Sequence, residues 1–341
     1  MSERLEDIAA AIVAGGKGLL AADESSGTIK KRFDVIGVES TADSRRDYRE
    51  MMFRAKDAMT KYISGVILYD ETIRQKAADG TPLVDIIKAS GSIPGIKVDL
   101  GAKALPGFPG DTITEGLDGL RERLADYYKL GARFAKWRAV IDIDTGKGVP
   151  SANSIASNTH ALARYAALCQ EAGIVPIVEP EVLMDGAHSI DTCYDVSKAT
   201  LVKLYDELYA ARVVLEGTIL KPNMIISGKK SGRTDAPEEI AEKTIKLFRQ
   251  VVPSAVPGIA FLSGGQEDEE ATANLNAINA IGPHPWKLTF SYGRALQAAP
   301  QKAWSGKASN IAAGQAAFTH RAHMNHLAAL GKWKPALEEA A

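Results

Sequence analysis

The stretch Gly217–Met224, GTILKPNM, is a short apolar run that ends in a lysine. Ile219 and Leu220 are typical of a buried strand, and Pro222 stops the strand because proline has no backbone N–H to donate. Lys221 stands between them, so the strand carries an ammonium group to the edge of the protein interior. The stretch predicts a strand with a chemically active group at its C-terminal end.

Seven other runs of this kind occur along the chain, and amphipathic segments with Leu, Ala and Tyr three and four residues apart lie between them. The repeating unit is therefore a strand followed by a helix. The eight runs are GLLAADES from residue 18, SGVILYDE from 64, IPGIKVDL from 93, ARFAKWRAV from 132, IVPIVEPEV from 174, GTILKPNM from 217, PGIAFLSGG from 257 and WKLTFSYG from 286.

Successive runs begin roughly 30 to 45 residues apart, as expected for βα units, and eight such units close a barrel. A doubly wound open sheet is the alternative, but it concentrates its site at one switch point. We therefore predict an α/β fold, a (β/α)8 TIM barrel, because polar residues end nearly every run. These residues are Asp23, Lys97, Lys136, Glu179, Lys221, Ser263 and Arg294.

The domain prediction is a single barrel over residues 1–341, with 1–17 as an N-terminal helical extension and 295–341 as a C-terminal helical tail. Residues 43–62 are predicted to form one long charged helix, and the prolines and glycines of 104–112 predict a turn-rich loop.

The composition excludes several classes of partner. With 41 basic and 42 acidic residues the net charge is -1, so no long-range field favours nucleic acid or a membrane surface. No stretch approaches the roughly 20 consecutive apolar residues that cross a bilayer, and the N-terminus lacks the pattern of a signal peptide. Cys169 and Cys193, the two cysteines, fit a reducing compartment. We expect a cytoplasmic protein.

Alternation along the strands sorts the polar groups by face. Lys136 and Arg138 share a face, as do Glu179 and Glu181, and Lys221 lies on the face of Ile219. Inward-facing, these groups would converge in one pocket. One interpretation is structural, with Lys136 paired to Glu179 and Lys221 paired to Glu181, because buried charges are usually paired.

The other interpretation is catalytic. An amine attacks a carbonyl only when it is uncharged, and a low-dielectric barrel mouth with a second cation nearby favours the uncharged form. Lys221 with Lys136 beside it is such an arrangement, with Glu179 able to carry the proton. This interpretation expects Lys221 to be unpaired.

Glycine-rich ends of the last two strands predict an anion site. LSGGQ, residues 262–266, and FSYGRAL, residues 290–296, offer hydroxyls, unobstructed N–H groups and a guanidinium, and the loops after strands seven and eight of a barrel frequently bind phosphate. Tight turns are the alternative explanation. The candidate residues are Ser263, Gly264, Gly265, Ser291, Gly293 and Arg294.

The end of the first strand offers Asp23 as a general base, and Ser25 and Thr28 after it could equally cap a helix. Lys97 could pair with Asp99 or contact a second anion. The histidines of HRAHMNH, residues 320–326, drift around a helix and have no carboxylate among them, so no metal site is expected.

The chain resembles the class I fructose-1,6-bisphosphate aldolases. VVLEGTILKPN, residues 213–223, is similar to the Schiff-base lysine signature of that family. LLAADESSGTIKKR, GIKVDLG, FAKWRAV, GIVPIVEPEVL, FLSGGQ and LTFSYGRALQ resemble its other segments, in the same order. The resemblance extends from about Leu5 to Lys332.

The resemblance implies a (β/α)8 barrel lyase (EC 4.1.2.13) of glycolysis and gluconeogenesis. It would cleave fructose 1,6-bisphosphate reversibly to dihydroxyacetone phosphate and glyceraldehyde 3-phosphate, as a homotetramer without metal or other cofactor. Lys221 would form the imine and Asp23 would accept the C4 hydroxyl proton. Glu179 would serve carbinolamine dehydration, with Glu181 close by and Lys136 tuning the proton transfers. The implied contacts of the C1 phosphate are Ser263, Gly264, Ser291, Gly293 and Arg294, and those of the other end are Ser25, Thr28, Arg32, Lys97 and Arg138.

One departure concerns the C-terminus. Animal members of that family end in a tyrosine on a flexible tail that is thought to assist proton exchange, whereas no tyrosine follows Tyr292 here, which predicts slower exchange or another acid/base. A transaldolase or another Schiff-base sugar-phosphate lyase would also explain an active lysine in a barrel, and a non-enzymatic scaffold would have its lysines fully paired. The sequence does not decide between fructose 1,6-bisphosphate and fructose 1-phosphate.

Overall fold

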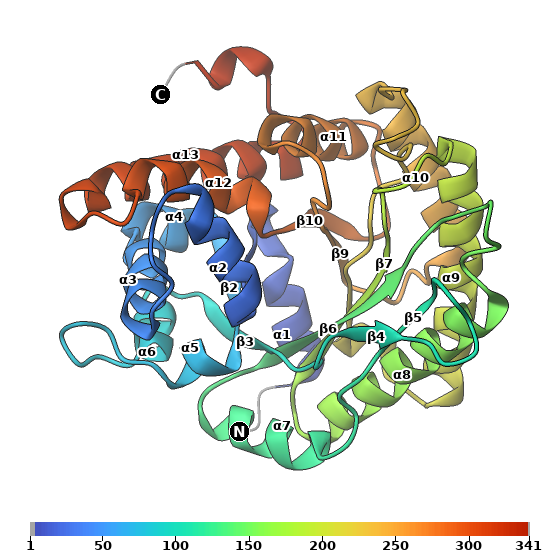
Figure 1. Ribbon diagram of the computed structural model, residues 1–341, viewed down its shortest axis with the longest axis horizontal. Helices are drawn as coiled ribbons and strands as arrows, with labels where there is room; N and C mark the ends of the chain where they lie inside the picture. The colour runs from blue at the N-terminus through green and yellow to red at the C-terminus, as the bar shows by residue number, and fades with distance from the viewer. Residues whose placement is uncertain (1–3, 340–341) are drawn as a thin grey trace.

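The computed structural model describes residues 4–339, so the outermost residues of the expected extension and tail, 1–3 and 340–341, lie outside it. Eight parallel strands close into a barrel in the order β1-β10-β9-β8-β7-β6-β3-β2, with helices around it (Figure 1). The fold prediction and all eight strand predictions are confirmed. The barrel strands are β1 (Gly18–Ala22), β2 (Ile63–Leu68), β3 (Ile93–Lys97), β6 (Phe134–Ile141), β7 (Val175–Val182), β8 (Ile219–Leu220), β9 (Gly258–Phe261) and β10 (Lys287–Tyr292).

Helices lie around the barrel, and most of them connect successive strands (Figure 1). They are α1 (Leu5–Ile12), α2 (Ser26–Val35), α3 (Ala42–Phe53), α4 (Lys56–Lys61), α5 (Asp70–Arg74), α6 (Leu83–Ala89), α7 (Leu120–Lys129), α8 (Ala152–Glu171), α9 (Ile190–Ala210), α10 (Pro237–Val251), α11 (Asp268–Ala280), α12 (Arg294–Trp304) and α13 (Ile311–Ala329).

One local prediction needs correction, and another is incomplete. The long helix predicted over 43–62 is broken, because Ala55 leaves the helical region with ψ 82°, and the two pieces, α3 and α4, each pack against α13. The loop predicted over 104–112 lies between two short antiparallel strands, β4 (Ala102–Ala104) and β5 (Thr112–Thr114). The sequence hid this hairpin because residues 102–104 are all exposed, so they show no apolar alternation.

The first helix closes the N-terminal end of the barrel. Ile8 and Ile12 of α1 are buried against the lowest inward-facing strand residues, among them Phe134 and Ile219. The close fit requires glycine at certain strand positions: a Cβ on Gly95 would lie 2.2 Å from the Phe134 ring. The barrel is therefore filled from below, and only the C-terminal ends of its strands remain for a site.

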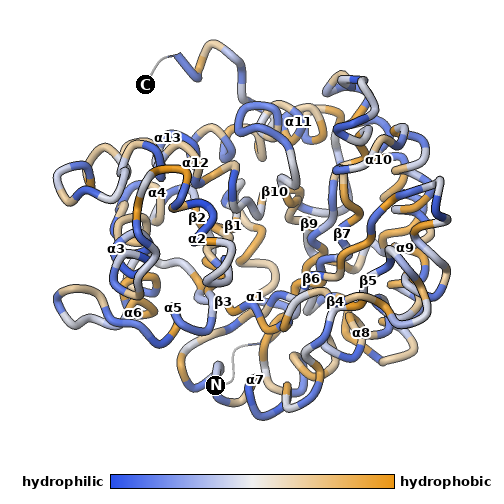
Figure 2. Tube along the Cα trace, viewed as in Figure 1, coloured by the Kyte–Doolittle hydropathy of each residue, from blue (hydrophilic) through white to orange (hydrophobic). Residues whose placement is uncertain are grey.

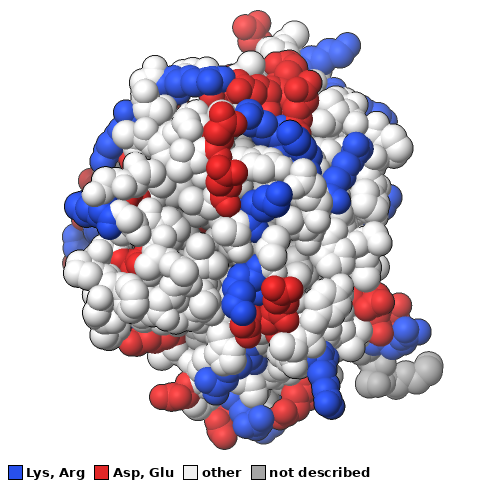
Figure 3. Space-filling model, turned by 90° about the vertical axis from the view of Figure 1, so that its right-hand side faces the viewer, with Lys and Arg blue, Asp and Glu red and all other residues white. Residues whose placement is uncertain are grey.

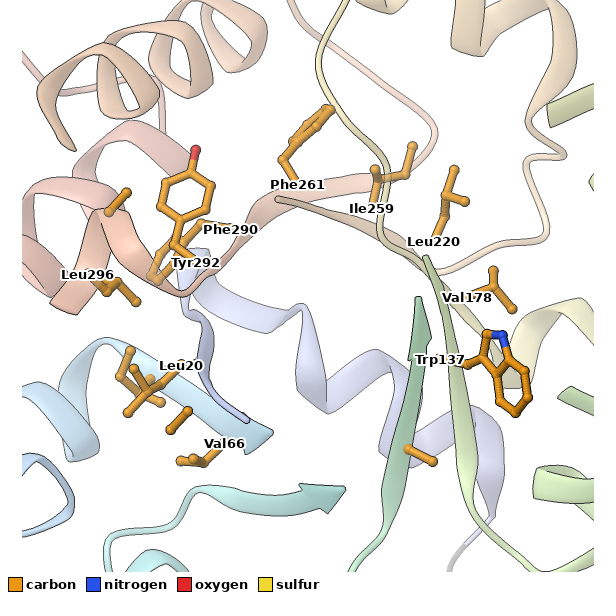
Figure 4. Close-up of a cluster of buried hydrophobic side chains, with 14 of the residues drawn as sticks. Leu20, Val66, Trp137, Val178, Leu220, Ile259, Phe261, Phe290, Tyr292 and Leu296 are labelled. Atoms are coloured by element: carbon orange, nitrogen blue, oxygen red, sulfur yellow. The ribbon is translucent and has the colours of Figure 1, made fainter. Parts of the chain in front are cut away.

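The outward-facing residues of the strands form the core between barrel and helices. Trp137, Val178, Leu220 and Ile259 lie on the side of their strands that faces the helices (Figure 4). Hydropathy alternates along the covering helices (Figure 2), as expected for amphipathic helices that bury one face. The residues before and after these outward-facing ones therefore point into the barrel, as the strand alternation predicts.

Positive and negative side chains are interspersed on the face in Figure 3, in keeping with the net charge of -1. Among the described residues, no helix is both long enough and apolar enough to span a membrane.

Candidate active site

A cavity of about 1100 Å³ opens at the C-terminal ends of the barrel strands. It is lined by every predicted site residue except Gly265, which points its N–H at the Met184 sulfur, 3.1 Å away. The predicted residues that line the cavity are Asp23, Ser25, Thr28, Arg32, Lys97, Lys136, Arg138, Glu179, Glu181, Lys221, Ser263, Gly264, Ser291, Gly293 and Arg294.

Lys221 is held in place by the chain around it. Its backbone N–H donates to Val178 O at 2.8 Å, which continues the pairing of β8 with β7. Two residues later, the Asn223 side chain accepts from Val182 N at 3.1 Å and donates to Ser197 Oγ at 3.3 Å. The segment after β8 is thus fixed to β7 and α9, so the lysine side chain is presented into the barrel in a defined direction.

Four charged groups, three of them buried and Asp23 half-buried, form a continuous chain across the floor of the cavity. Lys221 Nζ lies 3.1 Å from Glu179 Oε1, and Glu179 Oε2 lies 3.2 Å from Lys136 Nζ. Lys136 Nζ also lies 2.7 Å from Asp23 Oδ2. The order Lys221–Glu179–Lys136–Asp23 alternates in sign, so each group is stabilised by its neighbour.

This arrangement corrects two sequence-based expectations. Lys221 is not unpaired, because Glu179 accompanies it, and the suggested pair of Lys221 with Glu181 does not form. Glu181 is instead paired with the Arg138 guanidinium. The suggested pair of Lys136 with Glu179 does form. Alternation placed the groups on the correct faces, but the partner of each charge depends on side-chain reach across strands.

The charges of the chain set its protonation. Burial alone would raise the pKa of Asp23, but the charges of Lys136 and Lys221 outweigh it and hold the pKa at about 2. Burial likewise opposes the ionised form of Glu179, and the same two lysines lower the pKa of that carboxyl. Burial opposes the charged form of Lys136, whereas Asp23 and Glu179 raise the pKa of that lysine. At neutral pH both carboxyls are therefore ionised and Lys136 is a fixed cation.

A second ion pair flanks this chain. Lys97 Nζ lies 2.6 Å from Asp99 Oδ1, which is the pair that the sequence suggested, and Asp99 Oδ2 also accepts from the Arg138 backbone N–H at 3.2 Å. The Lys97 side chain remains 17% exposed. It therefore keeps access to the cavity and to an anion in it.

The ends of β9 and β10 provide donors for an anion. Ser291 Oγ is buried and makes no hydrogen bond within the described residues, although it lines the cavity. Gly264 has a positive φ of 57°, which glycine adopts without strain, and its carbonyl accepts from Arg294 Nη2 at 2.8 Å. The hydrogen bond fixes the Arg294 fork beside the turn, where Arg294 lines the cavity.

At the end of β1 the capping interpretation is confirmed, and the same residues also line the cavity. Ser25 caps α2, with its Oγ accepting from Thr28 N at 3.3 Å, and both hydroxyls line the cavity. Arg32 pairs with Glu24 at 2.5 Å. Its guanidinium lies against Gly293, since Arg32 Nη2 is 3.7 Å from where a Cβ on that glycine would be. Arg32 therefore stands on the side of the anion-binding strand ends.

Sequence reasoning missed part of the cavity wall. Glu24, Tyr69, Asp70, Arg74, Arg123 and Tyr127 also line it. Asp70 is at the polar end of the second run, SGVILYDE, so the rule that found the other strand ends could have found it. Arg123 and Tyr127 come from α7, and no local signal points from that helix to the site.

Within residues 4–339 no group of three or more His, Cys, Asp or Glu side chains is arranged to hold a metal ion. The C-terminal histidines have other contacts. His320 Nε2 lies 2.9 Å from Glu338 Oε2, and the His323 ring stacks on Tyr62 with centroids 4.9 Å apart.

Comparison with known proteins gives one consistent result. The family model for "Fructose-bisphosphate aldolase class-I" matches residues 4–341. A "Probable fructose-bisphosphate aldolase class 1" of Xanthomonas axonopodis pv. citri is 56% identical, covering 97% of this chain and 99% of its own. "Fructose-bisphosphate aldolase 4, cytosolic" of Arabidopsis thaliana is 53% identical, covering 96% of this chain and 82% of its own.

A solved structure is also similar. It is the fructose-bisphosphate aldolase of Plasmodium falciparum, in a complex with TRAP and a small-molecule inhibitor. The TM-score is 0.95 at 49% identity, and the match covers 97% of this chain and 95% of that one.

Proposed function

The chain belongs to the class I fructose-bisphosphate aldolase family, and from this membership we propose that Lys221 is the amine that forms the Schiff base. The activity is that of a glycolytic lyase: reversible cleavage of fructose 1,6-bisphosphate to dihydroxyacetone phosphate and glyceraldehyde 3-phosphate through a lysine Schiff base. The observation that carries the assignment is the chain of charges Lys221–Glu179–Lys136–Asp23 at the barrel mouth.

Glu179 begins the reaction by accepting the proton of the Lys221 ammonium, 3.1 Å away. The free amine then attacks C2 of the ketose to give a carbinolamine. Glu179, now protonated, donates its proton to the departing hydroxyl, which leaves as water, and an iminium remains. Lys136 lies 3.2 Å from the other oxygen of the same carboxylate and stabilises its ionised form between these transfers.

Asp23 takes the C4 hydroxyl proton in the cleavage step. Its pKa of about 2 keeps the carboxylate unprotonated at neutral pH, ready to accept. As that proton leaves, the C4 oxygen forms a carbonyl, and the electrons of the C3–C4 bond pass to the iminium. Glyceraldehyde 3-phosphate and an enamine on Lys221 result. Protonation at C3 and hydrolysis of the imine release dihydroxyacetone phosphate and restore the amine.

Two groups of donors bind the phosphates. The C1 phosphate would lie at Ser263, Gly264, Ser291, Gly293 and Arg294. In support, Ser291 Oγ is buried without a partner in the described residues, and a buried hydroxyl normally has one. Gly265 would contribute through the shape of the turn, because its N–H is used by Met184. The phosphate at C6 would be met by Ser25, Thr28, Arg32, Lys97 and Arg138.

Borohydride reduction tests the imine. The protein is treated with sodium borohydride in the presence of fructose 1,6-bisphosphate, and the adduct is mapped by peptide mass spectrometry. We expect one stable adduct on Lys221, and none in Lys221→Arg, because a guanidinium does not form the imine. Lys229→Arg is the matched control, since Lys229 is an exposed lysine on the loop after β8, and should keep the adduct. An adduct on another lysine would refute the assignment.

We propose further that the reaction needs no metal or organic cofactor, because the iminium itself accepts the electrons of the breaking bond. Activity should therefore survive dialysis against a chelator. Loss of activity on chelation, restored by a divalent cation, would contradict this.

Assembly, location and domain organisation are also proposals. We propose a cytoplasmic homotetramer, in line with family resemblance and the cytosolic Arabidopsis relative, and sedimentation velocity measures its mass. We propose a single domain over 1–341, with 1–17 and 295–341 as helical additions. It is supported by the burial of α1 in the barrel base and by the packing of α13 on α11 and β10.

A further inference from the structure

A buried glutamine joins the two strand ends that carry the base and the C1 phosphate donors. β1 and β10 are neighbours in the barrel, with Leu20 opposite Tyr292. The helix α12 begins at Arg294, one residue after the end of β10, and Gln297 lies in its first turn with none of its surface exposed. Gln297 does not line the cavity, so it contacts no substrate.

All the hydrogen-bonding groups of this side chain are used. Gln297 Nε2 donates to Ala21 O at 2.6 Å and to Glu24 Oε1 at 2.7 Å. Its Oε1 accepts from Tyr48 OH at 3.1 Å. Because a carbonyl and a carboxylate can only accept, the amide has one possible orientation, which the tyrosine hydroxyl completes.

These contacts bracket Asp23. Ala21 precedes it by two residues and Glu24 follows it directly. The backbone carbonyl of Glu24 is held separately, by the buried Arg49 at 3.0 Å. The same Glu24 carboxylate pairs with Arg32 at 2.5 Å. The chain on both sides of Asp23 is thus fixed to the helix that begins at Arg294.

We propose that Gln297 is a positioning residue that sets the place of Asp23 relative to the C1 phosphate donors. The inference rests on the proposed role of Asp23. Cleavage requires the carboxylate to reach the C4 hydroxyl while the C1 phosphate is held at Gly293 and Arg294, so the two strand ends must keep a fixed separation. A misplacement of about 1 Å can cost about 100-fold in rate.

The principal test compares Gln297→Met with Gln301→Met. Gln301 is one turn further along α12, is also mostly buried, and has an Nε2 without a hydrogen bond in the described residues. Each variant removes the same amide from the same helix. We measure kcat and KM for fructose 1,6-bisphosphate, the melting temperature, and the yield of borohydride adduct on Lys221.

For Gln297→Met we expect kcat to fall about 10- to 100-fold, KM to change by less than about threefold, and the adduct yield to stay at the wild-type level. Imine formation uses Lys221, Glu179 and Lys136, which Gln297 does not touch. Gln301→Met should keep kcat within about twofold. A kcat for Gln297→Met equal to that of Gln301→Met, or an adduct yield that falls in parallel with kcat, would overturn the proposal.

A gentler variant covers the case in which Gln297→Met does not fold. Tyr48→Phe removes only the hydroxyl that orients the amide, and it should lower kcat about threefold or more without changing KM; an unchanged kcat overturns the inference. Asp23→Asn distinguishes a failure of the positioning role from a failure of the proposed role of Asp23. If Asp23→Asn abolishes cleavage while Gln297→Met and Tyr48→Phe keep the wild-type kcat, the positioning role alone fails. If it cleaves normally, the proposed role of Asp23 fails first.

Discussion

Replacing Lys136 with methionine should raise the pKa of Asp23, so that its protonation becomes visible in the pH dependence of activity. Burial raises the pKa of Asp23, and Lys136 is the strongest of the charges that lower it, to about 2 from an ordinary 3.8. That difference corresponds to roughly 2 to 3 kcal/mol in favour of the ionised form. Without the lysine the burial penalty remains, so the pKa of Asp23 should rise above 3.8.

The assay is the pH profile of kcat/KM for cleavage between pH 4.5 and 8. In the wild-type protein Asp23 should contribute no acid limb in this range. In Lys136→Met we expect kcat/KM to be reduced about 100-fold or more. Its pH profile should also show an acid limb between pH 4.5 and 8. Lys136→Arg is the control: it retains a cation beside Asp23, so its activity should fall without the new limb.

The free energy of unfolding should depend on pH for the same reason. In the wild-type protein a carboxyl with a lowered pKa contributes stability above its unfolded pKa and loses it as the pH falls through its folded pKa. Removing one partner of a buried charge group costs about 3 kcal/mol, so Lys136→Met should be destabilised by about that amount at pH 7. The deficit should shrink toward pH 4, as a carboxyl takes up a proton. A pH profile superimposable on that of the wild type, or an equal deficit at both pH values, would refute this reasoning.

Three further outcomes are expected. Glu179→Gln should slow the appearance of the borohydride adduct about 100-fold or more, because no carboxylate then accepts the Lys221 proton. Rapid-quench trapping measures the rate of adduct formation. An undiminished rate would mean that another group accepts the proton. Ser291→Ala should raise KM about tenfold, which is the effect of losing one hydrogen bond to a charged group. The melting temperature should not change, because the hydroxyl has no hydrogen-bond partner in the described protein. A lower melting temperature at unchanged KM would contradict a phosphate contact. Gly95→Ala should lower the free energy of unfolding by about 1–3 kcal/mol, since its Cβ would lie 2.2 Å from the Phe134 ring. In denaturant titrations, adding Phe134→Leu should recover part of that loss. Additive effects of the two substitutions would contradict this contact.

The barrel could be predicted from sequence because it rests on local signals. Each strand is an apolar run ended by a polar residue, and alternation along Phe134, Lys136 and Arg138 gave the inward face correctly. The hairpin of β4 and β5 escaped because β4 is exposed along its whole length and so shows no apolar alternation. The break at Ala55 escaped because it depends on where α13 lies.

The residues of the cavity could also be predicted, but most of their partners could not. Lys97 and Asp99 are two residues apart, and their pairing followed from one strand face. Glu179 accompanies Lys221 across two neighbouring strands, where several lysines and carboxylates could reach each other. The bond from Gln297 to Ala21 spans 276 residues, and no spacing or motif in the sequence joins these positions.

The burial of α1 beneath the barrel has a consequence for the order of events during turnover. With Ile8 and Ile12 filling the far end, the ketose, both products and water share one entrance among the described residues. In the proposed mechanism, the half of the sugar attached to Lys221 stays anchored at depth after the carbon–carbon bond breaks. The aldehyde must therefore depart first, and dihydroxyacetone phosphate can leave only afterwards.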